Sequence, residues 1–186
     1  MPHPVLASGD PGGLASAGTR GTPANRFRSK APAMARAGKL APDFDLPTDG
    51  GGHVRLSDLA GEKVVVYFYP KDDTSGCTLE AIDFTKSAKA FARAGTRVIG
   101  ISPDTEKSHD KFKAKHGLGI TLAADPEKKA IEAYGVWVEK SMYGRKYMGV
   151  ERATFLIGPD RRIVQEWRKV RVPGHVDEVL EAAKGL

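Results

Sequence analysis

Two hydrophobic periods alternate along residues 39–186, one typical of strands and one typical of helices. Residues 64–69, Val-Val-Val-Tyr-Phe-Tyr, are β-branched or aromatic throughout, which predicts a central strand buried on both faces. Phe84, Ala88 and Phe91 recur at helical spacing and predict a helix over residues 76–93 that ends at Gly95. The same reasoning predicts further strands at residues 43–46, 53–56, 96–102, 120–123, 153–157 and 163–170, and further helices at residues 103–117, 127–134 and 173–184.

The order of these elements predicts the fold class. Strands alternate with helices, and the chain finishes in an antiparallel hairpin followed by a helix. This order indicates an α/β protein with a mixed central sheet flanked by helices on both faces. With right-handed crossovers it fits a thioredoxin-like sandwich among a few other topologies. Residues 39–186 show no internal repeat and no second domain, so we expect one thioredoxin-like domain there.

The first 38 residues form a different kind of segment. Residues 1–33 contain 19 Gly, Pro, Ala or Ser residues and no hydrophobic periodicity, a composition that cannot bury enough apolar surface to offset its ordering entropy. We therefore predict a disordered N-terminal extension over residues 1–38. Residues 5–7 are too short an apolar stretch for a secretory signal. A transit-like segment and a start codon assigned too early, with Met34 as the initiator, both stay open, and we prefer the second.

The positive charge of the chain is spread too evenly to indicate a nucleic-acid partner. The formal net charge is +6, of which residues 1–33 carry +3, and the rest of the chain carries +3 with acidic and basic side chains interspersed. This distribution favours a solvated surface of mixed charge over a binding patch. No apolar run approaches the roughly 20 residues of a membrane span. We therefore predict no nucleic-acid partner and no membrane partner.

Cys77 is the single cysteine of the chain. One cysteine excludes an internal disulfide and fits a reducing compartment such as the cytoplasm, and the count alone is typical of a buried, inert thiol. The position of Cys77 indicates more, because the loop of residues 70–76 leads from the buried strand into a helix and places the sulfur in the first helical turn. Unpaired backbone N–H groups and the helix dipole favour a thiolate there. A thiolate is the nucleophile that a peroxide O–O bond requires.

Thr74 lies three residues before Cys77. Its hydroxyl can point to the same place as the sulfur, where donors must stabilise the charge that develops when a peroxide bond breaks. Threonine is equally a good helix N-cap, and the spacing alone does not separate the two roles.

Residues 67–80 resemble a known active-site segment. Their sequence, Tyr-Phe-Tyr-Pro-Lys-Asp-Asp-Thr-Ser-Gly-Cys-Thr-Leu-Glu, is similar to the peroxiredoxin pattern of Pro, three residues, Thr or Ser, two residues and Cys. The Tyr-Phe-Tyr-Pro-Lys opening, the Gly-Cys-Thr step and the later residues 134–157 resemble the bacterioferritin comigratory (BCP/PrxQ) subfamily in particular. The resemblance extends from about residue 39 to the C-terminus.

The resemblance implies a role for each of five residues. Cys77 would be the peroxidatic nucleophile, the Thr74 hydroxyl would contact the peroxide, and the Arg152 guanidinium would lie beside the sulfur. Pro70 would shield the site from water, and Glu80 would position Arg152 through a charge-assisted hydrogen bond. Without the resemblance, Arg152 and Glu80 would be interpreted as solvated surface residues.

Two residues depart from the subfamily pattern. Ser75 stands where many members have a proline, which loosens the loop slightly. Ile82 stands where many members carry a second, resolving cysteine, so we expect a 1-Cys variant. The resemblance implies a peroxidase that reduces hydrogen peroxide and organic hydroperoxides and leaves a sulfenic acid on Cys77. Thioredoxin or a low-molecular-weight thiol would regenerate Cys77, and we expect a monomer or a weak dimer.

Alternative functions have weaker support. The same fold can carry a non-catalytic redox sensor or interaction module, and a basic nucleic-acid binder is a more distant reading. Hydrolase chemistry would pair Cys77 with a histidine, but we expect His109, His116 and His175 to be solvated. Residues 106, 109 and 110 are expected to form a helix surface and no metal site. The chain has no glycine-rich phosphate loop and no Cys-x-x-Cys pair, so we predict no cofactor and no dithiol chemistry.

Overall fold

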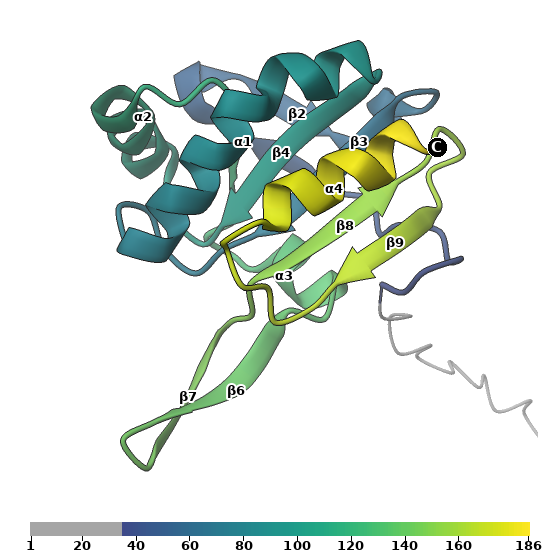
Figure 1. Cartoon of the computed structure of the whole chain (residues 1–186). Coiled ribbons are helices and arrows are strands. Elements are labelled where there is room, and N and C mark those ends of the chain that lie inside the picture. The colour runs from purple at the N-terminus through teal and green to yellow at the C-terminus, as the bar shows by residue number, and fades with distance from the viewer. Residues whose placement is uncertain (1–34) are drawn as a thin grey trace, which may run out of the picture. The chain divides into compact units, whose positions relative to one another are not determined.

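A five-stranded sheet forms the centre of the domain (Figure 1). The computed structural model describes residues 35–186. The strands of this sheet are β3 (Lys63–Phe68), β4 (Thr96–Ser102), β5 (Thr121–Ala124), β8 (Ala153–Ile157) and β9 (Ile163–Trp167). Their order is β5-β4-β3-β8-β9, with parallel pairing among β3, β4 and β5 and antiparallel pairing of β8 with β3 and with β9. The predicted mixed sheet is confirmed.

Helices cover both faces of this sheet. They are α1 (Ser75–Arg93), α2 (Glu106–His116), α3 (Lys129–Ala133) and α4 (His175–Lys184). In Figure 1, α1 and α4 lie side by side over one face. They share a hydrophobic core with Val65 and Tyr67 of β3. Val64 and Val66 point to the opposite core, which α3 covers through Ile131. The central strand is therefore buried on both faces, as the sequence predicted.

The first predicted hairpin is also present. It consists of β1 (Asp45–Pro47) and β2 (His53–Arg55), paired antiparallel, with the short 3-10 helix η1 (Asp49–Gly51) at the turn and η2 (Leu56–Leu59) after β2. Leu46 and Val54 of the hairpin join the core that α3 covers. The hairpin thus closes the sheet face opposite to α1 and α4.

The helix predicted at residues 127–134 is shorter than expected. It begins at Lys129 and not at residue 127, because Lys128 has a left-handed backbone with φ 59° and interrupts the helical path. The carboxylate of Asp125 accepts hydrogen bonds from the backbone N–H groups of Lys129 and Ile131, both at 2.9 Å. This carboxylate satisfies donors that the first turn leaves unpaired, and it determines where the helix begins.

The strand predicted at residues 163–170 ends at Trp167, and the helix predicted from residue 173 begins at His175. The backbone leaves the sheet at Lys169, which has a positive φ of 49°, and turns again at Gly174, with a φ of 76°. Between these turns the Val170 N–H donates to the Arg152 carbonyl oxygen at 3.0 Å. The segment that leaves the sheet therefore supports the backbone at Arg152.

A second hairpin, which the hydrophobic pattern did not predict, extends away from the sheet (Figure 1). It consists of β6 (Trp137–Met142) and β7 (Arg145–Val150), paired antiparallel with each other and not with the central sheet. Most of its residues are exposed, so no burial imposes the alternation by which strands are identified. Tyr143 and Gly144 form its turn with positive φ angles of 51° and 76°, as two-residue hairpin turns require.

The predicted N-terminal extension lies outside the described residues except for its last four positions. Ala35 is buried in the core, and the Gly38 N–H donates to the Ile163 carbonyl oxygen at 2.7 Å. The packed part of the chain thus begins before Lys39, because these residues pair with the start of β9. The expectation for residues 1–34 stays a prediction.

Candidate active site

Cys77 lies where β3 gives way to α1. Thr74 is the N-cap residue, with an extended backbone (φ −93°, ψ 154°), and Cys77 is the third residue of the helix. The sulfur therefore lies in the turn whose backbone N–H groups have no helical acceptor. Cys77 is only 2% exposed and packs against the core shared by α1 and α4. It combines a buried position with a place at a helix N-terminus.

Arg152 contacts this sulfur although it lies 75 positions later in the sequence. It lies between β7 and β8, and its Nη2 donates to Cys77 Sγ at 3.2 Å. Its Nη1 donates to Glu80 Oε2 and forms an ion pair with that carboxylate. Glu80 is 0% exposed and Arg152 has a side-chain exposure of 16%. The interpretation of both residues as solvated surface residues is therefore wrong, and the arrangement that the resemblance implied is present.

Burial sets the electrostatics of this group. It raises the pKa of Glu80 to about 7, against the opposing attraction of the Arg152 guanidinium. For Arg152, burial lowers the pKa, but the negative charges of Glu80 and Cys77 outweigh burial and raise it. Arg152 therefore stays cationic, and it donates to the sulfur from a charged guanidinium.

The hydroxyl of Thr74 does not cap α1. It donates to the Lys71 carbonyl oxygen at 2.9 Å, and the helix has no side-chain cap bond at this residue. This bond closes the loop between β3 and α1 on itself. The structure thus decides against the capping role, while the contact of Thr74 with a peroxide stays a prediction. Pro70 is half-buried in the same loop, and its shielding role also stays a prediction.

The histidines are less solvated than expected. His109 is fully buried and His175 is 5% exposed, because His109 packs below the loop and His175 packs between Phe84 and Trp167. Burial lowers the pKa of His175 to about 4, so its ring is neutral at neutral pH. Within residues 35–186 no histidine ring hydrogen-bonds to Cys77, so the hydrolase pairing has no geometric support.

Two further expectations concern residues near the site. The residues that the structure describes contain no group of three or more His, Cys, Asp or Glu side chains able to hold a metal ion. Glu106 and Asp110 are exposed on α2 as expected, but His109 is not. Ile82 is half-buried and packs against the core at the position where a resolving cysteine would stand.

Lys140 lies on β6, in the hairpin that the sequence reasoning missed. Burial, followed by repulsion from Arg152, lowers its pKa, while the charges of Glu151 and Cys77 raise it. No signal in the sequence identified this half-buried lysine, because the exposed hairpin that carries it has no hydrophobic pattern.

The replacement Glu80→Gln is expected to change how stability depends on pH. The pKa of Glu80 in the folded chain, about 7, lies above its ordinary value of 4.5, so the folded state binds this proton more tightly than the unfolded state. The resulting stability is complete below pH 4.5 and is lost as the pH rises through 7. Glutamine keeps the shape without the proton, so the wild type should lose stability relative to the variant over this range.

Urea unfolding of both proteins at pH 4.5, 6 and 7.5 measures this difference. The matched control is Glu62→Gln, which removes the exposed carboxylate that Arg97 binds. If the free energy of unfolding changed with pH in the same way in the wild type and in the Glu80→Gln variant, the raised pKa of Glu80 would be contradicted.

A mixed sheet with a cysteine at a helix N-terminus, held against a guanidinium, is typical of thiol-based redox enzymes of the thioredoxin fold. Comparisons with known proteins specify the class. The sequence model of the AhpC/TSA family matches residues 37–166. Peroxiredoxin Bcp of Bacillus subtilis is 49% identical over 149 residues, which cover 80% of this chain and 95% of that protein.

Solved structures agree with this result. A structure of Xanthomonas campestris peroxiredoxin Q is 42% identical and superposes with a TM-score of 0.76, covering 83% of this chain and 98% of that one. The bacterioferritin comigratory protein of the same organism, studied for its alkyl peroxide reduction activity, is 44% identical with a TM-score of 0.73, covering 76% of this chain and 90% of that one. The chain therefore belongs to the AhpC/TSA family and is a peroxiredoxin of the Bcp/PrxQ type, a thiol-dependent peroxidase.

Proposed function

We propose that Cys77 is the nucleophile of this peroxidase and that Arg152 and Thr74 hold the peroxide beside it. The observation that carries the proposal is the 3.2 Å hydrogen bond from Arg152 Nη2 to Cys77 Sγ in the first turn of α1. The guanidinium presents five N–H donors in a planar fork. Two of its nitrogens contact Cys77 and Glu80, and the remaining donors are available to peroxide oxygens.

The reaction follows from these positions. The Cys77 thiolate attacks one oxygen of the hydroperoxide, an S–O bond forms, and the O–O bond breaks. The second oxygen leaves with the electron pair of that bond and takes up a proton, as water from hydrogen peroxide or as an alcohol from an organic hydroperoxide. The sulfur is oxidised to a sulfenic acid as the peroxide is reduced. Arg152 stabilises the negative charge that develops on the leaving oxygen.

Glu80 and Pro70 support this site in the proposal. Glu80 holds the guanidinium through its ion pair with Arg152 Nη1, while Arg152 Nη2 contacts the sulfur. A charged, hydrogen-bonded partner restricts the rotation of the fork, so the donors stay directed at the sulfur and its substrate. Pro70, the second residue after the end of β3, limits the access of water to the loop.

An external thiol regenerates the enzyme in this proposal. Cys77 is the only cysteine in the sequence, and Ile82 occupies the position of the resolving cysteine. The thiolate of thioredoxin or of a small thiol attacks the sulfenic sulfur, forms a mixed disulfide and expels hydroxide, which leaves as water. A second thiol then attacks the mixed disulfide and releases Cys77. One peroxide thus consumes two thiols and yields one external disulfide.

The proposal also covers the compartment, the oligomeric state and the partners of the protein. A single reactive thiol suits a reducing compartment, and we place the enzyme in the cytoplasm as a monomer or weak dimer. The mixed charge of the surface gives no support to a nucleic-acid partner. In residues 35–186, no helix is long and apolar enough to cross a membrane.

Peroxide consumption with several thiol donors tests the proposal. We expect many turnovers per enzyme with a thioredoxin system or with glutathione, and a mixed disulfide at Cys77 that intact-mass spectrometry detects during turnover. Without a donor, excess peroxide should convert Cys77 to the sulfenic and then the sulfinic acid, or to a Cys77–Cys77 dimer. A wild-type enzyme that stops after one turnover with every donor would act as a redox sensor, and the proposed cycle would be wrong.

A further inference from the structure

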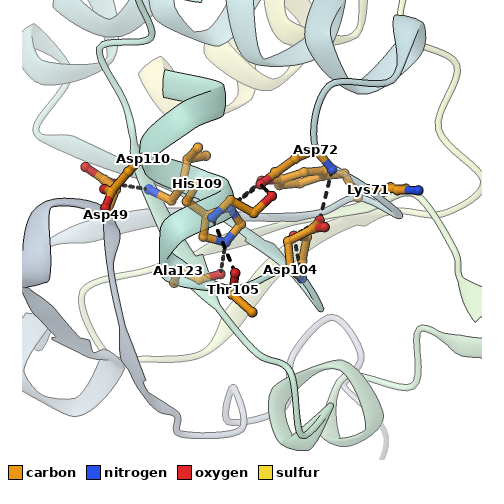
Figure 2. Close-up of polar contacts among 12 residues, drawn as sticks. Asp49, Lys71, Asp72, Asp104, Thr105, His109, Asp110 and Ala123 are labelled. Carbon is orange, nitrogen blue, oxygen red and sulfur yellow. Dashed lines mark hydrogen bonds and ion pairs between the residues drawn. The ribbon is translucent and has the colours of Figure 1, made fainter. Parts of the chain in front are cut away.

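A buried polar network lies beneath the loop that carries Thr74 (Figure 2). At its centre is Asp72, whose side chain is 4% exposed. The carboxylate accepts hydrogen bonds from the Tyr69 hydroxyl at 2.6 Å, from the Ser108 hydroxyl at 2.7 Å and from His109 Nδ1 at 2.8 Å. Two of these donors belong to α2, so the network joins the loop to that helix.

Both ring nitrogens of His109 face acceptors. Nδ1 lies 2.8 Å from the Asp72 carboxylate and Nε2 lies 3.1 Å from the Ala123 carbonyl oxygen on β5. Figure 2 shows the ring between these two groups. Burial raises the pKa of Asp72, but the hydrogen bonds from His109 and Tyr69 outweigh burial and lower it, so Asp72 is ionised. The two ring nitrogens of His109 therefore tie the ionised Asp72 carboxylate of the loop to the Ala123 carbonyl oxygen of β5.

The backbone of the loop is held at the same residue. The Asp72 N–H donates to Asp104 Oδ2 at 2.9 Å, and the Ser102 hydroxyl donates to the same oxygen at 2.7 Å. The next residue, Asp73, has a left-handed backbone with φ 57°, which non-glycine residues adopt only where their surroundings hold them. Thr74 follows directly, and its hydroxyl bonds back to the Lys71 carbonyl oxygen. The path of the loop from residue 71 to Thr74 therefore depends on the anchor at Asp72.

We infer that Asp72 and His109 are positioning residues of the peroxidase reaction, which fix the β3–α1 loop so that the Thr74 hydroxyl and the first turn of α1 meet the peroxide at Cys77. The inference rests on the proposed roles of Thr74 and Cys77. A buried polar contact is by itself weak evidence for stability, because an apolar pair of similar size stabilises a core as well. What a carboxylate with three directed partners adds is a single geometry for the loop that contains it.

Asp73 provides a matched control within the same loop. It also pairs with α2, through Lys115 Nζ at 2.6 Å and His116 Nε2 at 2.7 Å. Its side chain is 45% exposed, so water can replace these partners. Asp72→Asn and Asp73→Asn therefore make the same chemical change at adjacent positions, one anchored below the loop and one exposed at its surface.

Steady-state kinetics of the two half-reactions test the inference. For Asp72→Asn we expect kcat/KM for hydrogen peroxide to fall about 10- to 100-fold, since small misplacements of reacting groups have effects of this size. We expect kcat/KM for the thiol donor to stay within about twofold, since the external thiol attacks an already formed sulfenic acid. Asp73→Asn should leave both constants within about twofold. A purely structural role would lower the active fraction and reduce both constants of Asp72→Asn together.

Ser108→Ala keeps the test valid if Asp72→Asn fails to fold. It removes one of the three partners of Asp72 and leaves the contact with His109 intact, so we expect a folded variant with a smaller, severalfold loss in kcat/KM for hydrogen peroxide alone. Wild-type peroxide kinetics in folded Asp72→Asn, or in Ser108→Ala where Asp72→Asn does not fold, would overturn the inference. So would equal losses in both half-reactions or equal losses in Asp72→Asn and Asp73→Asn. An inactive wild type would instead contradict the proposed function, so the two failures are distinguishable.

Discussion

Cys77→Ser is expected to abolish peroxide turnover, with a loss on the order of 10⁴-fold or more, as when a catalytic nucleophile is removed from other enzymes. Serine occupies nearly the same volume, so the packing of this 2% exposed side chain against the core should change little. Its hydroxyl stays protonated, however, even beside the Arg152 guanidinium and the helix N-terminus, and an alcohol is a poor nucleophile toward an O–O bond. The loss should therefore be chemical and not structural.

The experiment measures hydrogen peroxide consumption with a saturating thiol donor, and thermal unfolding of both proteins under the same conditions. We expect melting temperatures within a few degrees of each other and an activity of the variant at the level of the uncatalysed reaction. Because the sequence contains no other cysteine, no second thiol can take over. Catalytic turnover by Cys77→Ser would therefore disprove the assignment of the nucleophile.

Arg152→Lys is expected to reduce kcat/KM for peroxide about 100-fold although it keeps the positive charge. The guanidinium donates to Cys77 Sγ from one nitrogen and to Glu80 from another. An ammonium group is a single point of charge and cannot hold the sulfur, the carboxylate and a peroxide oxygen in one plane. The loss of one well-placed donor to a developing negative charge typically costs about 100-fold or more in rate.

The matched control for this variant is Arg97→Lys. Arg97 also forms a forked contact with a glutamate, to the two carboxylate oxygens of Glu62 at 3.1 and 3.3 Å, but both side chains are exposed. Its replacement should leave the rate constant unchanged. If Arg152→Lys retained wild-type kinetics, the positive charge at this position would be sufficient, and the planar fork of Arg152 would have no direct part in the reaction.

Local sequence signals were sufficient for much of the fold. β3 is buried on both faces and therefore reads as a continuous apolar run, and α1 is buried along one stripe and therefore has apolar residues at helical spacing. The exposed hairpin of β6 and β7 has no buried face, so its pattern contained no signal. The start of α3 also eluded the pattern, because the Asp125 carboxylate and the left-handed Lys128 decide it.

Local sequence signals likewise predicted some residues of the candidate site and missed others. That Cys77 and Thr74 lie at the start of a helix after a buried strand follows from residues within one segment, since turn and cap chemistry act over a few positions. The resemblance to peroxiredoxins added Arg152 and Glu80, which composition and spacing alone would have left on the surface. Arg152 contacts Glu80, which lies 72 positions earlier in the chain, and the sulfur of Cys77, which lies 75 positions earlier.

The sequence by itself therefore determined the fold class, the place of Cys77 in the first turn of a helix and the lack of a second cysteine, because each depends on neighbouring residues or on a count. Only the tertiary structure decided which charges meet Cys77 and which are buried. His109 shows the reason: its local sequence is that of a charged surface helix, yet the approach of Asp72 and of the Ala123 carbonyl oxygen gives its ring two buried acceptors. Desolvation and ion pairing arise from segments that meet only in the folded chain, and no local pattern contains them.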